Sequence, residues 1–173
     1  MKFDKAFEIL IGHEGGYTNN PNDNGNWTGG VKGKGTLKGT KYGIAANSYP
    51  NLDIKNLTLA EAKAIYKRDY WDKVRCDELP EKVRFQIFDM AVNAGTNRAI
   101  KILQQSLGFP TREVDGILGK NTLAKIQAAD GDSLVLLYSA NRIEFYTSLS
   151  TFGTFGRGWM RRVASSIKTA VNN

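Results

Sequence analysis

Apolar side chains recur along the first residues at the spacing of an amphipathic helix. They fall at positions i, i+3, i+4, i+7 and i+8, which places them on one face. Glu14 continues this stripe, and Gly15 and Gly16 then end the helix. The pattern therefore places an acidic side chain at the end of a buried helical face. The apolar residues of the stripe are Phe3, Ala6, Phe7, Leu10 and Ile11.

The same periodicity predicts helices along the rest of the chain. A capping box formed by Thr58 and Glu61 marks one helix start. Pro80 fits the first position of a second helix, and Gly95 fits its end. Residues 152–156 are too irregular to assign. The helices predicted in this way span about residues 59–71, 80–94, 97–107, 133–148 and 157–171.

A glycine-rich segment interrupts the helical pattern. Residues 25–39 hold six glycines among small and branched residues, which is typical of a twisted hairpin with flexible corners. We therefore expect a β-wing here. With 173 residues and 41% hydrophobic content, the chain is long enough for one core and requires no second domain. The predicted fold class is α+β and mainly α, with a small glycine-rich β-wing.

Two carboxylates in the first part of the chain form a candidate acid and base. Burial on one side is expected to raise the pKa of Glu14 above its ordinary value of about 4.3, which keeps a proton available near neutral pH. Asp23 lies in a run of turn-forming residues and is expected on a wetter loop. Glycoside hydrolysis uses such a pair. The alternatives are a fraying helix end for Glu14 and a turn residue bonded to its own backbone for Asp23.

These residues belong to motifs that resemble a known family. Residues 14–17 (Glu-Gly-Gly-Tyr), Asp23 and residues 39–44 (Gly-Thr-Lys-Tyr-Gly-Ile) are similar to the phage-type N-acetylmuramidases of glycoside hydrolase family 108, which are lysozyme-like endolysins. The similarity covers nearly the whole chain. Further segments that look like the family are residues 70–71, 88–95, 115–119 and 156–163.

The resemblance implies a lysozyme-like catalytic arrangement. Glu14 would be the general acid, Asp23 the carboxylate that activates or orients water, and a threonine would position that water. Thr28 has the spacing found in compact members of the family, whereas Thr40 has the Thr-x-x-Gly-Ile context. We favour Thr40 because local context constrains backbone geometry more closely than residue count. A strand hydroxyl bonded to backbone is the structural alternative for Thr40.

The resemblance also implies two lobes that face each other across a groove for a glycan strand. One lobe, residues 1–79, would carry the catalytic Glu and the wing, and residues 80–173 would form a helical lobe with peptidoglycan-binding character. The motif at residues 115–122 resembles a turn in peptidoglycan-binding repeats, although its plain interpretation is a loop and a helix start.

Several polar and aromatic residues are candidates for substrate contacts. Tyr42 belongs to the Thr-x-x-Gly-Ile step, and Tyr70 can stack on a sugar face or pack in the core. Asn93 can cap a helix or bind an N-acetyl group. Gln104 is expected to be available for sugar hydroxyls. Asp89, flanked by apolar residues, fits a buried structural acid better than a wall of the cleft.

Charge and composition limit the partners. A net charge of +7 and a pI near 9.5 indicate attraction to a polyanion. Basic residues interleaved with aromatics in an RNP or OB pattern are missing from the sequence, so an anionic bacterial envelope fits better than nucleic acid. His13 is the only histidine, which argues against a His-rich zinc site, and we expect no metal and no cofactor. The single cysteine, Cys76, is expected to be a small, partly buried filler that forms no intramolecular disulfide.

The amino-terminal residues bear on where the protein acts. Charges at Lys2, Asp4, Lys5 and Glu8 interrupt any apolar stretch, so we expect no signal peptide, and no transmembrane run occurs. The resemblance then implies synthesis in the bacterial cytoplasm and access to the cell wall of the periplasm through a separate pore-forming protein. We also expect the protein to act as a monomer.

The predicted activity is hydrolysis of the β-1,4 bond between N-acetylmuramic acid and N-acetylglucosamine, leading to cell lysis. An inverting route is expected if a water fits between the two carboxylates. Three alternatives remain open at this point. They are a lytic transglycosylase, a chitinase-like glycosidase and a non-catalytic wall-binding module.

Overall fold

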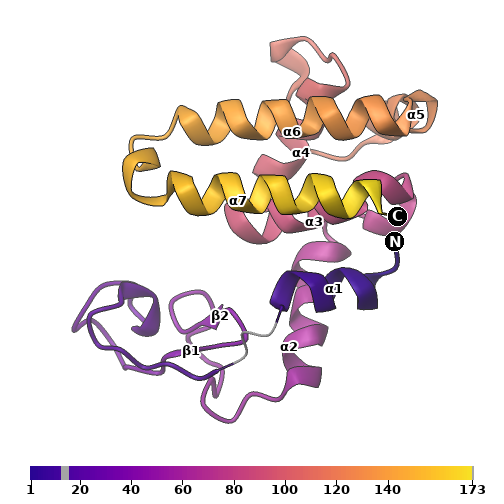
Figure 1. Ribbon diagram of the computed structural model, residues 1–173. Helices are drawn as coiled ribbons and strands as arrows, with labels where there is room; N and C mark the ends of the chain where they lie inside the picture. The colour runs from indigo at the N-terminus through magenta and orange to yellow at the C-terminus, as the bar shows by residue number, and fades with distance from the viewer. Residues whose placement is uncertain (13–15, 173) are drawn as a thin grey trace. The chain divides into compact units, whose positions relative to one another are not determined.

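A computed structural model describes residues 1–12 and 16–172 of the chain (Figure 1). Within these residues it contains seven α-helices and one two-stranded sheet. The predicted fold class, α+β and mainly α, is therefore confirmed. The contacts divide the chain into two compact units. Unit 1 comprises Met1–Ala6 and Lys67–Asn173, and unit 2 comprises Phe7–Tyr66.

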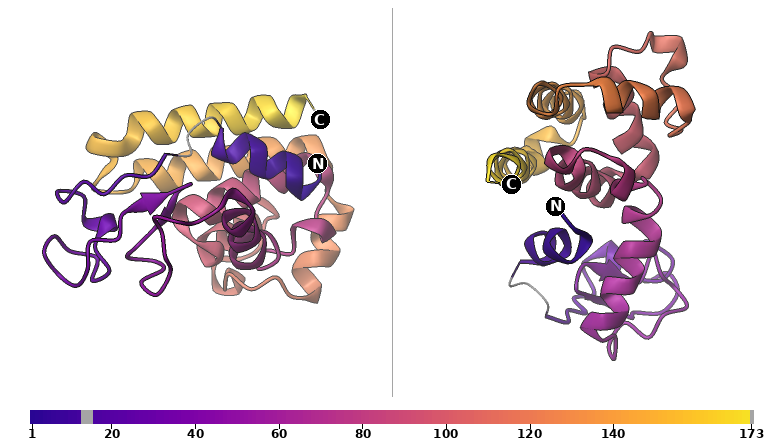
Figure 2. Two further views of the ribbon diagram at one scale, coloured as in Figure 1. Left: turned by 90° about the horizontal axis from the view of Figure 1, so that it is seen from below. Right: turned by 90° about the vertical axis from the view of Figure 1, so that its right-hand side faces the viewer.

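Unit 1 is a layered bundle of helices. Helix α3 (Glu81–Ala94) packs against α4, α6 and α7. Helices α6 and α7 lie side by side and run in opposite directions, with α3 against them (Figures 1 and 2). The other helices of this unit are α4 (Thr96–Ser106), α5 (Lys120–Ala128), α6 (Gly131–Thr147) and α7 (Phe152–Val171).

An aromatic cluster anchors one end of the unit 1 core. Trp71 is fully buried, and its ring lies 5.4 Å from the ring of Phe3 and 5.4 Å from that of Phe88, both edge to face. Each such pair contributes about 0.5–1.5 kcal/mol beyond the burial of apolar area. Residues 67–79, which the sequence analysis assigns to the first lobe, contain Trp71 and therefore pack with the helices of unit 1. The two-lobed organisation itself stays a prediction.

A buried ionic cluster ties α3, α6 and α7 together. Asp89 is 3% exposed, and its two carboxylate oxygens lie 2.8 Å from Nη2 of Arg142 and 2.8 Å from Nε of Arg162. Burial is the largest single effect on Arg142 and opposes its charge, but the Asp89 carboxylate, Tyr146 and Tyr138 together outweigh it, so the pKa of the guanidinium is raised. The expected structural role of Asp89 agrees with this placement.

Unit 2 holds the sheet and the helix that follows it. Strand β1 (Thr40–Lys41) pairs antiparallel with β2 (Ile44–Ala45). Helix α1 (Phe3–Ile11) begins in unit 1, and its part in unit 2 includes Phe7, whose ring lies 5.6 Å from that of Tyr66 on α2 (Leu59–Tyr66). The predicted capping box is confirmed, because the Glu61 carboxylate accepts bonds from the backbone N–H and hydroxyl of Thr58.

The predicted β-wing over residues 25–39 is wrong in its detail. These residues form turns with a single bridge between Trp27 and Leu37, and the two-stranded ladder begins only at Thr40. Gly30, Gly33 and Gly35 all have positive φ angles, which redirect the backbone and prevent an extended ladder. A short 3-10 helix, η1 (Asn24–Asn26), opens the segment.

Most predicted helices lie close to the observed ones. The helix expected over 59–71 is α2 followed by a π-helical turn, η2 (Lys67–Trp71). Residues 152–156, whose sequence pattern is irregular, form the first part of α7. The loop and helix start expected at 115–122 agree with α5, which begins at Lys120.

Candidate functional site

Asp23 lies on an exposed turn of unit 2. Its Oδ1 accepts a hydrogen bond of 2.9 Å from the backbone N–H of Gly25, which caps η1. Its own N–H donates to the carbonyl of Asn20. The turn role considered for Asp23 is thus present. It leaves the carboxylate at the surface, where a water and a sugar can reach it.

Thr40 lies on β1, beside the chain that leads to the Asp23 turn. Its backbone forms a bridge with Thr18, and its hydroxyl donates a hydrogen bond of 2.7 Å to Oδ1 of Asn26. Thr28, the alternative to Thr40, accepts a bond of 2.9 Å from the N–H of Thr36 within the glycine-rich segment. Of the two threonines, Thr40 is therefore the one bonded to η1, the turn that Asp23 caps.

Asn26 joins these pieces and was missed by the sequence analysis. Its side chain is fully buried, and its amide donates to the carbonyl of Asn20 while its Oδ1 accepts from Thr40. Its backbone carbonyl accepts from the N–H groups of Lys38 and Gly39. Asn26 thus holds the Asp23 turn against β1. In the sequence it stands in an Asn-Gly-Asn step, which indicates a turn but gives no sign of burial.

Close packing explains the glycine before Thr40. Gly39 has a φ of +83°, and a Cβ there would clash with the carbonyl of Thr18 and the ring of Tyr17. Tyr42, two residues after Thr40, also has a positive φ of 51°. The hydroxyl of Tyr66 donates a bond of 3.0 Å to the carbonyl of Tyr42, which supports this uncommon conformation. The Tyr42 ring is half-buried and lies 5.4 Å from the ammonium of Lys41.

A cavity of about 310 Å³ lies in the same unit. Its lining includes Tyr17, Asn51 and Asp53, an aromatic residue with an amide and a carboxylate residue beside it. Hydrogen bonds from the side chain and backbone of Asn56 lower the pKa of Asp53, so that it carries charge at neutral pH. An aromatic ring with neighbouring polar groups is a combination that suits a sugar ring.

The remaining predicted contact residues lie in unit 1. Tyr70 is half-buried in η2. Asn93 is exposed near the end of α3, and its Oδ1 accepts a bond of 2.7 Å from the hydroxyl of Tyr146. The structure therefore gives Asn93 a partner on α6 and leaves its amide nitrogen for other bonds.

Gln104 is less accessible to sugar hydroxyls than the sequence suggests. Its side chain is 2% exposed, and its amide nitrogen donates to Oδ1 of Asp115 and to the carbonyl of Ile117. Its Oε1 accepts from the N–H of Gly116. These bonds hold the Asp-Gly turn before α5, and the first of them lowers the pKa of Asp115. Gln104 is a structural residue, because burial and internal bonds occupy its amide.

The proposed proton donor, Glu14, lies outside the described residues, as does His13. Among residues 1–12 and 16–172, no group of three or more His, Cys, Asp or Glu side chains could hold a metal ion.

Comparison with known proteins identifies the part of the chain that carries this site. Residues 7–95 match the family model described as Glycosyl hydrolase 108. The chain belongs to glycosyl hydrolase family 108. Residues 98–164 match a model described as a predicted peptidoglycan domain. The two matches together make this family 108 protein a peptidoglycan hydrolase.

A solved structure is similar to this protein over nearly the whole chain. The structure described as that of Brucella abortus SagA has a TM-score of 0.80 and is 31% identical. The similarity covers 98% of this family 108 chain and 94% of that chain. Among the curated proteins, none matches at a significant level.

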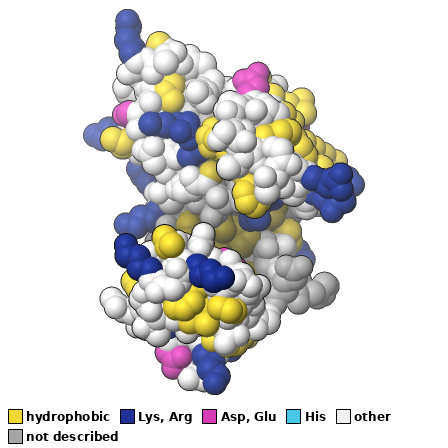
Figure 3. Space-filling view, turned by 90° about the vertical axis from the view of Figure 1, so that its left-hand side faces the viewer, with side chains coloured by type: hydrophobic (Ala, Val, Ile, Leu, Met, Phe, Trp, Pro, Cys, Tyr) yellow, Lys and Arg dark blue, Asp and Glu magenta, His cyan; other side chains and the backbone are white. Residues whose placement is uncertain are grey.

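This family 108 protein has a formal net charge of +7. On the face drawn in Figure 3, Lys and Arg side chains are spread widely and Asp and Glu are few. None of the described helices has the length and apolar character needed to cross a membrane.

Proposed function

We propose that the protein is an N-acetylmuramidase that cleaves the β-1,4 bond between N-acetylmuramic acid and N-acetylglucosamine. Glu14 is the proton donor, Asp23 activates the attacking water, and Thr40 positions that water. The observation that carries the proposal is the Asn26 side chain, which joins the Asp23 turn to Thr40 inside the region that matches the glycosyl hydrolase family. Tyr17 and Asn51 in the adjacent cavity support a sugar-binding role for this unit.

The chemistry requires two carboxyl groups with different tasks. Glu14 donates its proton to the glycosidic oxygen as the bond to C1 of the muramic acid breaks. Asp23 accepts a proton from a water molecule whose oxygen forms the new bond to C1. The products are a chain with a muramic acid reducing end and a chain that begins with N-acetylglucosamine. An inverting outcome follows if a water separates the two carboxylates.

The substrate contacts that we propose are Tyr42, Tyr70 and Asn93. Tyr42 lies two residues from Thr40, and its carbonyl bond to Tyr66 gives it a defined backbone. Tyr70 keeps part of its ring accessible, and Asn93 keeps an amide nitrogen for an N-acetyl oxygen. We infer that the basic surface favours the anionic envelope, that the enzyme works as a monomer, and that it is made in the cytoplasm and lyses cells from the periplasm.

Mass spectrometry of fragments released from purified peptidoglycan tests the proposal. Reducing muramic acid ends are expected from the parent enzyme, and no fragments are expected from Glu14→Gln. Anhydro-muramyl products from an active Asp23→Asn variant would instead identify a lytic transglycosylase. Cleavage of chitin oligomers without action on peptidoglycan would identify a chitinase-like enzyme. Retained wall clearing by Glu14→Gln would contradict the catalytic role.

A further inference from the structure

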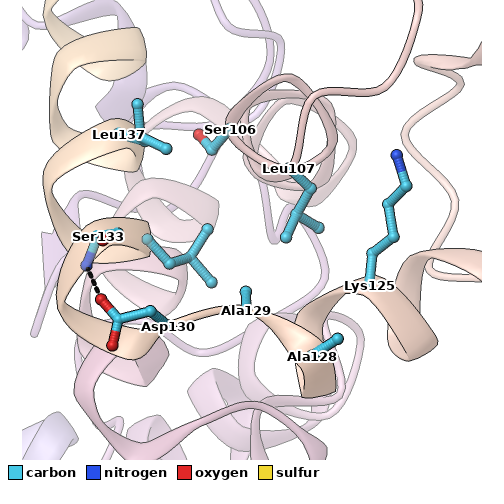
Figure 4. Close-up of a pocket in the computed structure, with 9 residues that line it drawn as sticks. Ser106, Leu107, Lys125, Ala128, Ala129, Asp130, Ser133 and Leu137 are labelled. Carbon is cyan, nitrogen blue, oxygen red and sulfur yellow. Dashed lines mark hydrogen bonds between the residues drawn. The ribbon is translucent and has the colours of Figure 1, made fainter.

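A pocket in the peptidoglycan-domain region has no role in the chemistry above. It lies where α4, α5 and α6 meet, has a volume of about 290 Å³, and all its lining residues fall between Ser106 and Leu137 (Figure 4). Ligand pockets usually measure about 300–1,000 Å³, so this one suits a short segment of a ligand rather than a glycan strand.

Small residues at the junction of α5 and α6 create the hollow. Ala128 ends α5, and Ala129 and Asp130 lead directly into α6. Two methyl groups thus stand where larger side chains would close the gap between the helices. The walls are the apolar side chains of Leu107, Leu134 and Leu137. Leu137 is 51% exposed, which leaves an apolar edge in contact with water.

One charge of each sign stands at this pocket. Lys125 and Asp130 lie on opposite sides of it in Figure 4. The backbone N–H of Ser133 donates a bond of 2.8 Å to the Asp130 carboxylate and lowers its pKa, so Asp130 is charged at neutral pH. The ammonium of Lys125 lies 4.1 Å from the centre of the ring of Phe109, a residue that does not itself line this pocket, and this contact restrains the cation.

This combination selects a class of ligand. A polyanion would meet the Asp130 carboxylate as well as the Lys125 ammonium, which disfavours nucleic acid and teichoic-type polymers. None of the lining residues is aromatic, which disfavours a stacked sugar ring. A short peptide with small methyl side chains, a carboxylate and an ammonium group matches both the apolar walls and the two opposite charges.

We propose that this pocket binds the peptide stem of peptidoglycan. Alanine methyl groups of the stem enter between Ala129, Leu107 and Leu134, a stem carboxylate faces Lys125, and the free ammonium of the diamino acid faces Asp130. The inference rests on the proposed function only in taking peptidoglycan as the substrate. It assigns the stem peptide, rather than the sugar chain, to residues 98–164. The pocket would then hold the enzyme on the wall between cleavage events.

Titration of the full-length protein with a free stem tetrapeptide tests this assignment. The tetrapeptide contains alanine, glutamate, a diamino acid and a terminal D-alanine, and it lacks a glycosidic bond. Amide NMR shifts are expected to cluster on the residues around the pocket. A peptide-free oligomer of N-acetylglucosamine is expected to leave these resonances unchanged.

Matched variants locate the contacts. Ala129→Leu fills the hollow and is expected to weaken binding at least about tenfold, whereas Ala124→Leu adds the same side chain on an exposed face of α5 that does not line the pocket. Lys125→Gln is expected to weaken binding about threefold, with Lys120→Gln as its control. The carboxylate on the opposite side of the pocket, Asp130, is tested by a second pair of variants. Asp130→Asn keeps the helix cap and is expected to weaken binding about threefold, with Asp132→Asn as its control.

The outcomes separate this inference from the proposed function. Peptide shifts that fall outside the pocket, equal binding by the parent and all three pocket variants, or pocket shifts caused by the sugar oligomer would each overturn the inference. If Ala129→Leu fails to fold, the two charge variants carry the test. None of these measurements involves bond cleavage, so loss of peptide binding with intact muramidase products would reject the pocket alone. Peptide binding by an enzyme without muramidase products would reject the proposed function alone.

Discussion

The buried Asn26 side chain offers the sharpest test of how the candidate site is held together. The Asn26→Ala variant removes the acceptor for the Thr40 hydroxyl, a bond of 2.7 Å, and the donor to the Asn20 carbonyl, a bond of 3.0 Å. Each bond contributes about 1 kcal/mol net. Thr40 is half-buried and Asn20 is exposed, so water can reach their freed groups in part. We therefore expect the free energy of unfolding to fall by about 2 kcal/mol, rather than by the larger cost of two fully buried groups.

Activity is expected to fall more than stability. The backbone carbonyl of Asn26 stays in the variant, but the side-chain link between the Asp23 turn and Thr40 is lost. A displacement of about 1 Å in a catalytic group costs about a hundredfold in rate. We expect kcat/KM on solubilised peptidoglycan to fall about a hundredfold at a temperature where the variant stays folded. Urea unfolding followed by tryptophan fluorescence measures the stability of the same samples.

Asn24→Ala provides the matched control for this prediction. Asn24 lies two residues earlier in η1, is exposed, and accepts one bond of 2.9 Å from the N–H of Lys32. Its loss is expected to cost under about 1 kcal/mol and to change kcat/KM less than about threefold. A double-mutant cycle of Asn26→Ala with Thr40→Val should show a coupling energy of about 1 kcal/mol. Additive effects, or equal losses for Asn26→Ala and Asn24→Ala, would refute the link that we describe.

Three further predictions concern the rest of the molecule. The Asp89→Asn variant leaves Arg142 buried without its charge partner and is expected to lower the free energy of unfolding by about 3–5 kcal/mol, measured in urea; a loss under 1 kcal/mol would contradict the buried pair. Burial raises the pKa of the Cys76 thiol, so alkylation by iodoacetamide at pH 8 should occur only as the protein unfolds, and rapid labelling of the native enzyme would count against it. The pKa of Asp115 is lower in the folded state than its ordinary value of 3.8, so this carboxylate stabilises the fold above that value and the contribution is lost as the pH falls below it. When the pH is lowered from about 5 to about 3, the Tm of Asp115→Asn should therefore fall less than the Tm of the parent. An equal fall in the two proteins would argue against the Gln104 bond as the cause of the lowered Asp115 pKa.

The sequence predicted the helices well because the features that mark a helix, its end residues and its apolar spacing, lie within a few residues of one another. The capping pair Thr58 and Glu61 and the glycine at residue 95 mark helix ends through bonds that neighbouring residues make. The buried positions Val83, Ile87 and Ala91 on α3 repeat at helical spacing, and Cys76 fills a buried space as a small residue would. These features need no knowledge of distant contacts.

The wing and the buried polar residues depend on contacts that spacing does not reveal. Residues 25–39 alternate in the way strands do, but glycines with positive φ angles bend the backbone into turns. Asn26 and Gln104 are polar residues that become buried because their amides satisfy several backbone groups at once. A sequence shows the amide but not the loop that will close around it, so both roles required the structure.

The candidate site was likewise predicted in part from the sequence, and the rest required the structure. The motif around Asp23 and Thr40 could be recognised from the sequence, and the hydrogen bond from Thr40 to Asn26 shows how the two segments are joined. Choosing Thr40 over Thr28 stays a prediction, although only Thr40 of the two bonds to η1. Glu14 also stays a prediction. The first helix was expected to end at Gly15 and Gly16, but α1 ends at Ile11 and Gly12 follows with a φ of +57°, so the role of Glu14 rests on the family motif rather than on the helical stripe.

The central claim is that Glu14 donates the proton, and the rate of the Glu14→Gln variant tests it most directly. The release of reducing ends from purified peptidoglycan should fall by at least about a thousandfold, with a Tm within about 2 °C of the parent. Glu8→Gln is the control, since Glu8 is an exposed residue of α1 and should keep full activity. A Glu14→Gln enzyme that is folded and still releases muramic acid reducing ends at a rate close to that of the parent would contradict the account.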